Sequence, residues 1–136
     1  MISFNYETDF KLSKAQDFSK WISNVIVSED CREGDINYIF CSDDYLHDIN
    51  LKYLNHDTLT DIISFDYSVG KELHGDIYIS IERVADNAKD FNVEFTEELK
   101  RVMVHGVLHY CGYKDKSESD KLTMRSKEDF YINQLS

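Results

Sequence analysis

The residues best suited to chemistry lie in one short stretch, which reads His105-Gly-Val-Leu-His109-Tyr-Cys-Gly112-Tyr-Lys-Asp115. On a helix, side chains four positions apart project from the same face, so His105 and His109 can hold one ion between their ring nitrogens. Gly112 can adopt a positive φ angle and reverse the chain, which would bring Asp115 back towards the two rings. Two nitrogens and one carboxylate leave a fourth position for water, which is the ligand count of a catalytic zinc site.

Other interpretations of this stretch stay open. A histidine pair at this spacing is by itself more often an ordinary core or surface pair, and Asp115 lies in a polar run where a surface aspartate is common. The spacing is also that of metzincin peptidases, in which a Glu after the first His is the general base. Here that position is Gly106, which disfavours a peptidase. Cys111 would point roughly 200° away from His109 around the helix, so we do not expect it to be a ligand.

The second half of the chain is predicted to be mostly helical. Residues 96–112 carry apolar side chains at helical spacing and begin with acidic residues that suit a helix N-terminus, which predicts the helix that bears both histidines. A last helix is predicted over about residues 119–134, with Leu122, Arg125 and Tyr131 among its inward-facing positions.

The first half alternates short strand and helix signals. One helix is predicted behind Ser13, which can form a capping box with Gln16, and two more behind Ser42 and Ser80. About four strands and about five helices predict an α+β fold, a single domain over residues 1–136 with a small mixed sheet. The predicted strands cover residues 2–6, 36–41, 61–67 and 76–80.

Composition narrows the class of protein further. The chain has 136 residues, is 42% hydrophobic and carries a net charge of −11, which argues against disorder and against broad, nonspecific binding of RNA or DNA. The sequence shows no membrane span and no signal peptide, and its three cysteines form no CxxC pair. A cytoplasmic protein with reduced thiols is therefore expected, with no membrane partner and no DNA partner.

Three ordered motifs resemble those of one family. The stretch from His105 to Asp115 follows a signature close to HGxLHLxGYDH, Thr60-Asp61-Ile62-Ile63-Ser64-Phe65 is similar to T-D-V-L-S-F, and Gly75-Asp76-Ile77-Tyr78-Ile79 is similar to G-D-I-x-I. Together they resemble the YbeY-type metal-dependent endoribonucleases. The resemblance covers about residues 50 to 115, and the chain length agrees with it.

The resemblance implies an α+β domain that binds one zinc ion and cleaves single-stranded RNA. It implies action in maturation of the 3′ end of small-subunit rRNA and in ribosome quality control, with the small ribosomal subunit or its assembly factors as partners. By motif position, the metal ligands would be His105, His109 and Asp115. The family's third ligand is most often His, so the carboxylate of Asp115 moves the expected preference towards harder ions such as manganese. The family's N-x-x-Y-R segment ends here in Leu54, where an Arg is thought to contact phosphate.

Proton transfer and phosphate binding need further residues. Asp61 is the candidate catalytic residue, although its carboxylate could instead bind backbone amides of the preceding loop. Ser64 is more often structural, and His56 is an outside candidate for the rim of the cleft. Phosphate neutralisation would fall to cations just past the metal motif, unless these form a solvated helix face. They are Lys114, Lys116, Lys121 and Arg125.

Three functions therefore compete at this stage. The leading one is a metal-dependent RNA hydrolase acting on ribosomal RNA. The second is a ribosome-assembly or binding module in which the metal only braces the fold. The third is a hydrolase of peptides or small molecules.

Overall fold

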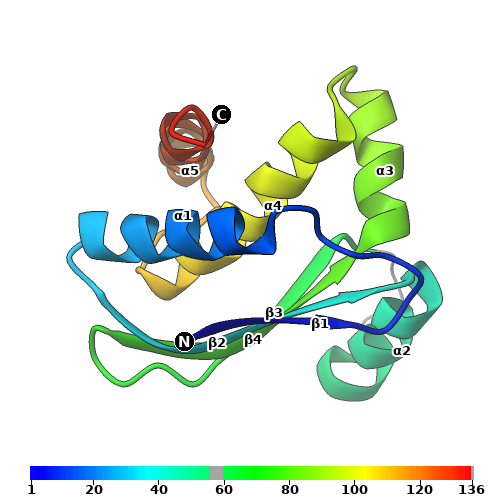
Figure 1. The fold of residues 1–136 in the computed structure, drawn as a ribbon, viewed down its shortest axis with the longest axis horizontal. Helices are drawn as coiled ribbons and strands as arrows, with labels where there is room; N and C mark the ends of the chain where they lie inside the picture. The colour runs from blue at the N-terminus through cyan, green and yellow to red at the C-terminus, as the bar shows by residue number, and fades with distance from the viewer. Residues whose placement is uncertain (56–59, 136) are drawn as a thin grey trace.

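The computed structural model describes residues 1–55 and 60–135, which fold as a four-stranded sheet covered by helices (Figure 1). The strand order is β1-β2-β4-β3. β1 and β4 both run parallel to β2, whereas β3 pairs with β4 in the antiparallel direction and forms one edge. The sheet is therefore mixed, and the α+β prediction is confirmed. The strands are β1 (Ile2–Tyr6), β2 (Arg32–Cys41), β3 (Ile62–Asp66) and β4 (Glu72–Ser80).

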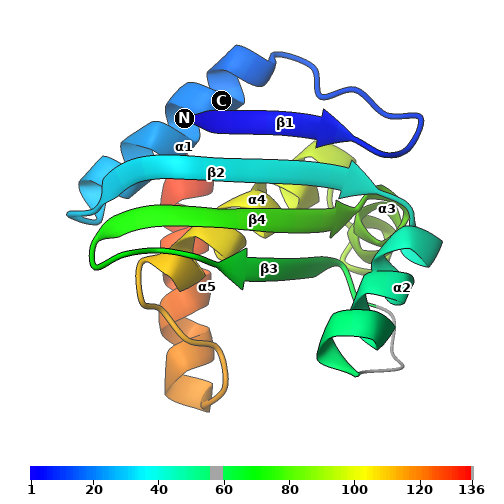
Figure 2. The same cartoon turned by 90° about the horizontal axis from the view of Figure 1, so that it is seen from below.

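Helices cover mainly one face of this sheet. In Figure 1, α1, α3, α4 and α5 lie on one side, and Figure 2 shows the other side, where α2 sits at one end of the strands. α4 packs on β3 and β4 and also contacts α1, α3 and α5, so it is the central helix of the layer. No helix in the described part of the chain is long and apolar enough to cross a membrane. The helices are α1 (Ala15–Ser28), α2 (Asp43–Leu54), α3 (Ile81–Asp90), α4 (Phe95–Tyr110) and α5 (Glu118–Ile132).

The main core lies between the sheet and the helix layer. Alternate residues of β2 and β4, such as Tyr38 and Ile77, are fully buried there against α4 residues such as Met103. The hydroxyl of Tyr38 donates a hydrogen bond of 2.8 Å to the carbonyl of Met103, so this buried polar group is paired. The opposite face carries a smaller cluster around Leu46 of α2 and Ile63 of β3. α4 is thus held firmly against the sheet, with its position fixed on several sides.

Two predicted helix starts need correction. The capping box at Ser13 does not form: the residue before α1 is Lys14, in a left-handed conformation with φ 57° and without a side-chain cap. Leu12 is buried, and its amide donates to the Tyr6 hydroxyl (3.3 Å), so packing of this loop sets the entry into α1. α4 begins at Phe95 rather than at Thr96. The other two predicted caps are present, because the hydroxyls of Ser42 and Ser80 accept from the third backbone amide beyond.

The predicted inward face of the last helix is also partly wrong. Tyr131 is buried, but Leu122 is 72% exposed and Arg125 is exposed as well. The buried side of α5 consists of Met124, Glu128 and Tyr131, which share one face at helical spacing. Hydrophobic periodicity does not count Glu128 as an inward-facing residue, because its side chain is charged. The predicted buried face of the helix was therefore rotated away from the observed one.

Candidate metal centre

The end of α4 brings the three candidate ligands together through local geometry. His105 and His109 lie one turn apart in the helix. Beyond the helix, the Gly112 amide donates to the carbonyl of His109 (3.0 Å) and the next amide donates to that of Leu108 (3.1 Å), which is a Schellman termination. Gly112 has a φ of 107°, which favours glycine. The predicted chain reversal is therefore present, and it returns Asp115 to the histidine pair.

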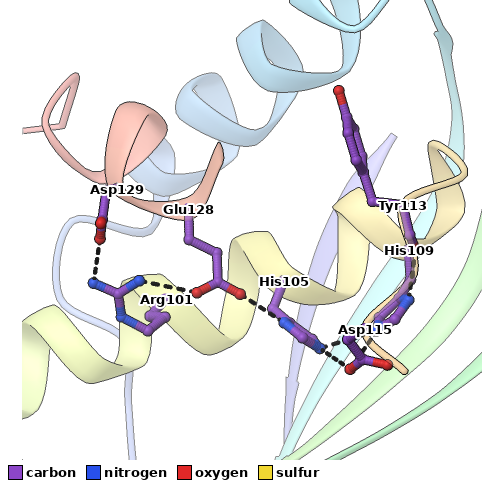
Figure 3. Close-up of polar contacts among 7 residues, drawn as sticks. All are labelled: Arg101, His105, His109, Tyr113, Asp115, Glu128 and Asp129. Carbon is purple, nitrogen blue, oxygen red and sulfur yellow. Dashed lines mark hydrogen bonds and ion pairs between the residues drawn. The ribbon is translucent and has the colours of Figure 1, made fainter. Parts of the chain in front are cut away.

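Three electron-pair donors converge at this point (Figure 3). The two Nε2 atoms of His105 and His109 are 3.0 Å apart, and the Oδ2 atom of Asp115 is 3.3 Å from each. Ligand atoms at the 2.0–2.1 Å typical of zinc, arranged as a tetrahedron, lie about 3.3–3.4 Å from one another. The three atoms therefore match one face of a tetrahedral site, and the group could hold a metal ion.

Neighbouring acceptors fix the tautomer of both rings. The Nδ1 of His109 lies 2.9 Å from the carbonyl oxygen of Tyr113, and that of His105 lies 2.6 Å from a carboxylate oxygen of Glu128. Neither oxygen donates, so Nδ1 is the donor on each ring, and Nε2 is the nitrogen that faces the site and can bind a metal ion.

Glu128 of α5 links this group to a buried ion pair. Its side chain is 6% exposed, and its second oxygen accepts from Arg101 at 2.9 Å, while Arg101 also reaches Asp129 at 2.7 Å (Figure 3). Burial by itself lowers the pKa of His105, but the hydrogen bond and charge of Glu128 outweigh it, and the pKa is raised. Glu128 therefore orients the ring and makes its nitrogens more basic towards a cation.

A cavity of about 470 Å³ opens beside the three ligand atoms. Asp61, the residue before β3, lines it and accepts a hydrogen bond of 3.4 Å from Asn87 of α3. Burial raises the pKa of Asp61, partly opposed by the nearby charge of His105. Glu98 of α4 also lines the cavity, is 5% exposed, and has a pKa raised by burial and by the charge of Asp61. The cavity thus joins a candidate ion site to the half-buried carboxyl group of Asp61 and the buried one of Glu98.

The remaining predicted residues divide between this cavity and other places. Ser64 lines the cavity, whereas Leu54, the last residue of α2, does not. His56 lies outside the described residues. Cys111 lines a separate hollow together with Cys31, away from the ligand atoms. Lys121 and Arg125 line a second hollow beside the ligands, and Lys114 and Lys116 line neither.

The sequence patterns did not identify three residues of the site. Glu98 and Arg101 precede His105 by seven and four positions, so helical periodicity was sufficient to place them on the histidine face. Glu128 carries no such local signal, because it approaches from α5. Its hydrogen bond to His105 joins residues 23 positions apart.

Comparison with known proteins agrees with this geometry. The profile of the family described as endoribonuclease YbeY matches residues 3–136. The chain belongs to the YbeY family. It is 70% identical to the endoribonuclease YbeY of Flavobacterium johnsoniae over 95% of this chain and 93% of the relative, and 44% identical to that of Bacteroides thetaiotaomicron over 85% and 84%. The family resemblance inferred from the motifs is thus confirmed.

A solved structure shows the same architecture. The solution structure of the Thermotoga maritima protein TM1509 matches with a TM-score of 0.69 and 25% identity, over 99% of this chain and 89% of that one. The chain therefore shares its fold as well as its motifs with proteins already described.

The YbeY motifs have clear structural reasons in this chain. Gly75 leaves room for Tyr110, whose hydroxyl donates to the carbonyl of Phe65 (2.9 Å) and ties the end of α4 to β3. Gly106 faces the sheet, where a Cβ atom would approach methyl groups of Ile77 and Ile62 to 3.1–3.2 Å. The glycine between the histidines is thus a packing residue, because any side chain at this position would displace the methyl groups of the sheet.

Proposed function

We propose that this YbeY-family protein is a metal-dependent endoribonuclease that hydrolyses single-stranded RNA, with His105, His109 and Asp115 as its metal ligands. The observation that carries the proposal is the convergence of three candidate ligand atoms, 3.0–3.3 Å apart, beside a cavity. The two relatives compared above are named as endoribonucleases, which supports RNA as the substrate class.

We propose zinc as the resident ion. Two imidazole nitrogens and one carboxylate oxygen are ligands that zinc accepts, and the spacing fits a tetrahedral site with one open position. The carboxylate also makes manganese a reasonable alternative. When bound, such an ion supplies Lewis-acid polarisation of a phosphoryl oxygen and makes a coordinated water more acidic.

The side chains around the ion would orient the reaction and handle protons. Glu128 holds the ring of His105 in place, and the Tyr113 carbonyl holds that of His109. We assign Asp61 as the group that accepts a proton from the attacking water, because it lines the same cavity and its raised pKa makes it a stronger base than an exposed aspartate. The absence of a side chain at Gly106 leaves this task to the cavity carboxylates.

The biological substrate we propose is the 3′ end of small-subunit rRNA, with the small ribosomal subunit or its assembly factors as partners in the cytoplasm. The family relationship supports this assignment. A net charge of −11 makes a selective encounter on a ribosomal particle more favourable than broad binding to any RNA.

Cleavage of a single-stranded oligoribonucleotide tests the proposal. The zinc-loaded protein should cut it, and His109→Ala and Asp115→Ala should lose cleavage together with metal content well below one ion per chain. Asp48→Ala, which removes an exposed carboxylate of α2, is the control and should retain both. Equal cleavage by all variants would indicate a contaminating nuclease and refute the proposal. Full metal content without any cleavage by the unaltered protein would instead support the assembly-module function.

A further inference from the structure

We propose that Lys121 and Arg125 of α5 form a phosphate-binding edge that holds the RNA backbone next to the metal centre. This inference rests on the proposed function and names the residues that bind the substrate's flanking phosphates. The RNA backbone would run from the cavity, past the three ligand residues, to the turns of α5 that carry Lys121 and Arg125.

The two cations lie beside the candidate ligands. A second hollow, of about 280 Å³, adjoins the main cavity and shares His105, Asp115 and Glu128 with it. Lys121 and Arg125 line this hollow from α5. Because they are four positions apart on one helix, they project from the same face one turn apart. A strand of RNA with one phosphodiester at the ligand group would therefore meet both cations along its backbone.

The main cavity is rich in carboxyl groups, so binding of RNA there requires cations nearby. Four carboxyl groups line it: Asp61, Glu98, Asp115 and Glu128. A polyanion is repelled by these groups unless positive charge is supplied nearby.

Other cations around the site are already neutralised within the protein. Arg101 is paired with two carboxylates, and Lys127 is paired with Glu29 at 3.2 Å. Within residues 1–55 and 60–135, by contrast, Arg125 forms no ion pair. Lys121 has one weak pair, at 3.9 Å with Glu118, whose side chain is 93% exposed. Both α5 cations are therefore available to an anion from solution.

The exposed position of Arg125 also fits a contact with phosphate. Its guanidinium can donate two parallel hydrogen bonds to one phosphate group, which a lysine cannot do. Its charge already acts on the cavity, where it opposes the effect of burial and of Asp61 on the pKa of Glu98. An exposed side chain that is not packed in the core can be replaced without loss of the fold.

Binding measurements with matched charge changes test this inference. The variants are Arg125→Gln, Lys121→Gln and the double variant. The controls are Lys20→Gln, and Lys20→Gln combined with Lys89→Gln, which remove the same charge from exposed residues of α1 and α3 that line neither hollow. The probe is a short 2′-O-methylated oligouridine, which resists cleavage, bound to the zinc-loaded protein over a series of salt concentrations.

The expected result is specific to the α5 pair. Arg125→Gln should raise Kd about tenfold, and the double variant should reduce the slope of log Kd against log salt concentration by about 1.4, since each phosphate contact on single-stranded nucleic acid contributes about 0.7. The controls should stay within about twofold of the unaltered protein with an unchanged slope. In cleavage assays, KM should rise and kcat should stay nearly constant for the α5 variants.

Each alternative outcome has a clear meaning. If the protein cleaves RNA but the α5 variants and the controls change Kd and slope equally, the inference is overturned and the proposed function stands. If the unaltered protein neither binds the probe nor cleaves RNA, the proposed function fails and the inference fails with it.

Discussion

Replacement of Glu128 by glutamine tests how far the site depends on support from α5. Glu128 accepts from His105 at 2.6 Å and from Arg101 at 2.9 Å, and its side chain is only 6% exposed. Glutamine keeps the size of the side chain but removes the negative charge that both partners face. A hydrogen bond to a charged, buried partner contributes about 1.5–3 kcal/mol. Loss of such a bond behind a ligand histidine commonly lowers metal affinity 10–100-fold, which corresponds to about 1.4–2.8 kcal/mol.

Zinc affinity measured by competition with a chromophoric chelator is the direct assay. Glu128→Gln should weaken zinc binding about 10–100-fold at neutral pH. Asp129→Asn is the matched control, because it removes the other carboxylate partner of Arg101, is 53% exposed and does not contact His105. Its zinc affinity should stay within about twofold of the unaltered protein. Urea unfolding of the zinc-free proteins would show that both variants keep the fold.

One result would refute this reasoning. If Glu128→Gln binds zinc as tightly as Asp129→Asn, the orientation and basicity of His105 do not depend on the buried carboxylate. The metal centre would then be defined by α4 and its reversal alone.

Three further predictions concern the parts that hold this site in place. Burial raises the pKa of Glu29, but hydrogen bonds from two tyrosines and a lysine outweigh it and lower the pKa below its ordinary value of 4.5. The charged form therefore stabilises the fold above pH 4.5, and this contribution is lost as pH falls through the lower folded-state pKa. In urea unfolding at pH 7, Glu29→Gln should lower the free energy of unfolding by about 1–3 kcal/mol, and this loss should become smaller below pH 4.5. A loss that does not change with pH would contradict the assignment. Gly112→Ala should lower the free energy of unfolding by about 1–3 kcal/mol and reduce metal content, because φ is 107° there and the strain would displace Asp115; unchanged stability would show that the turn tolerates a Cβ atom. Leu54→Arg should tighten binding of single-stranded RNA if the end of α2 faces phosphate, and an unchanged Kd would remove that position from the substrate path.

Much of the fold was predictable because its signals are local. Alternation of apolar residues identified the four strands, and serine caps located the starts of α2 and α3. The order of the sheet needed tertiary contacts, because β2 pairs in parallel with both β1 and β4, which are distant from it in the chain, whereas β3 and β4 are consecutive strands. Asp76 illustrates this limit: the amide of Asn37 in β2 donates to its carboxylate in β4 (3.0 Å), and no local pattern predicts a contact between residues 39 positions apart.

The sequence by itself determined the histidine pair and the chain reversal at Gly112, because both depend on backbone geometry within a few residues. Only the tertiary structure decided what surrounds them. The rotation of α5 about its axis, set by packing of Met124 and Tyr131, turns Glu128 inward to His105 and leaves Arg125 outside. Helical periodicity fixes which residues share a face, but the direction of that face depends on contacts with elements that are distant in the chain.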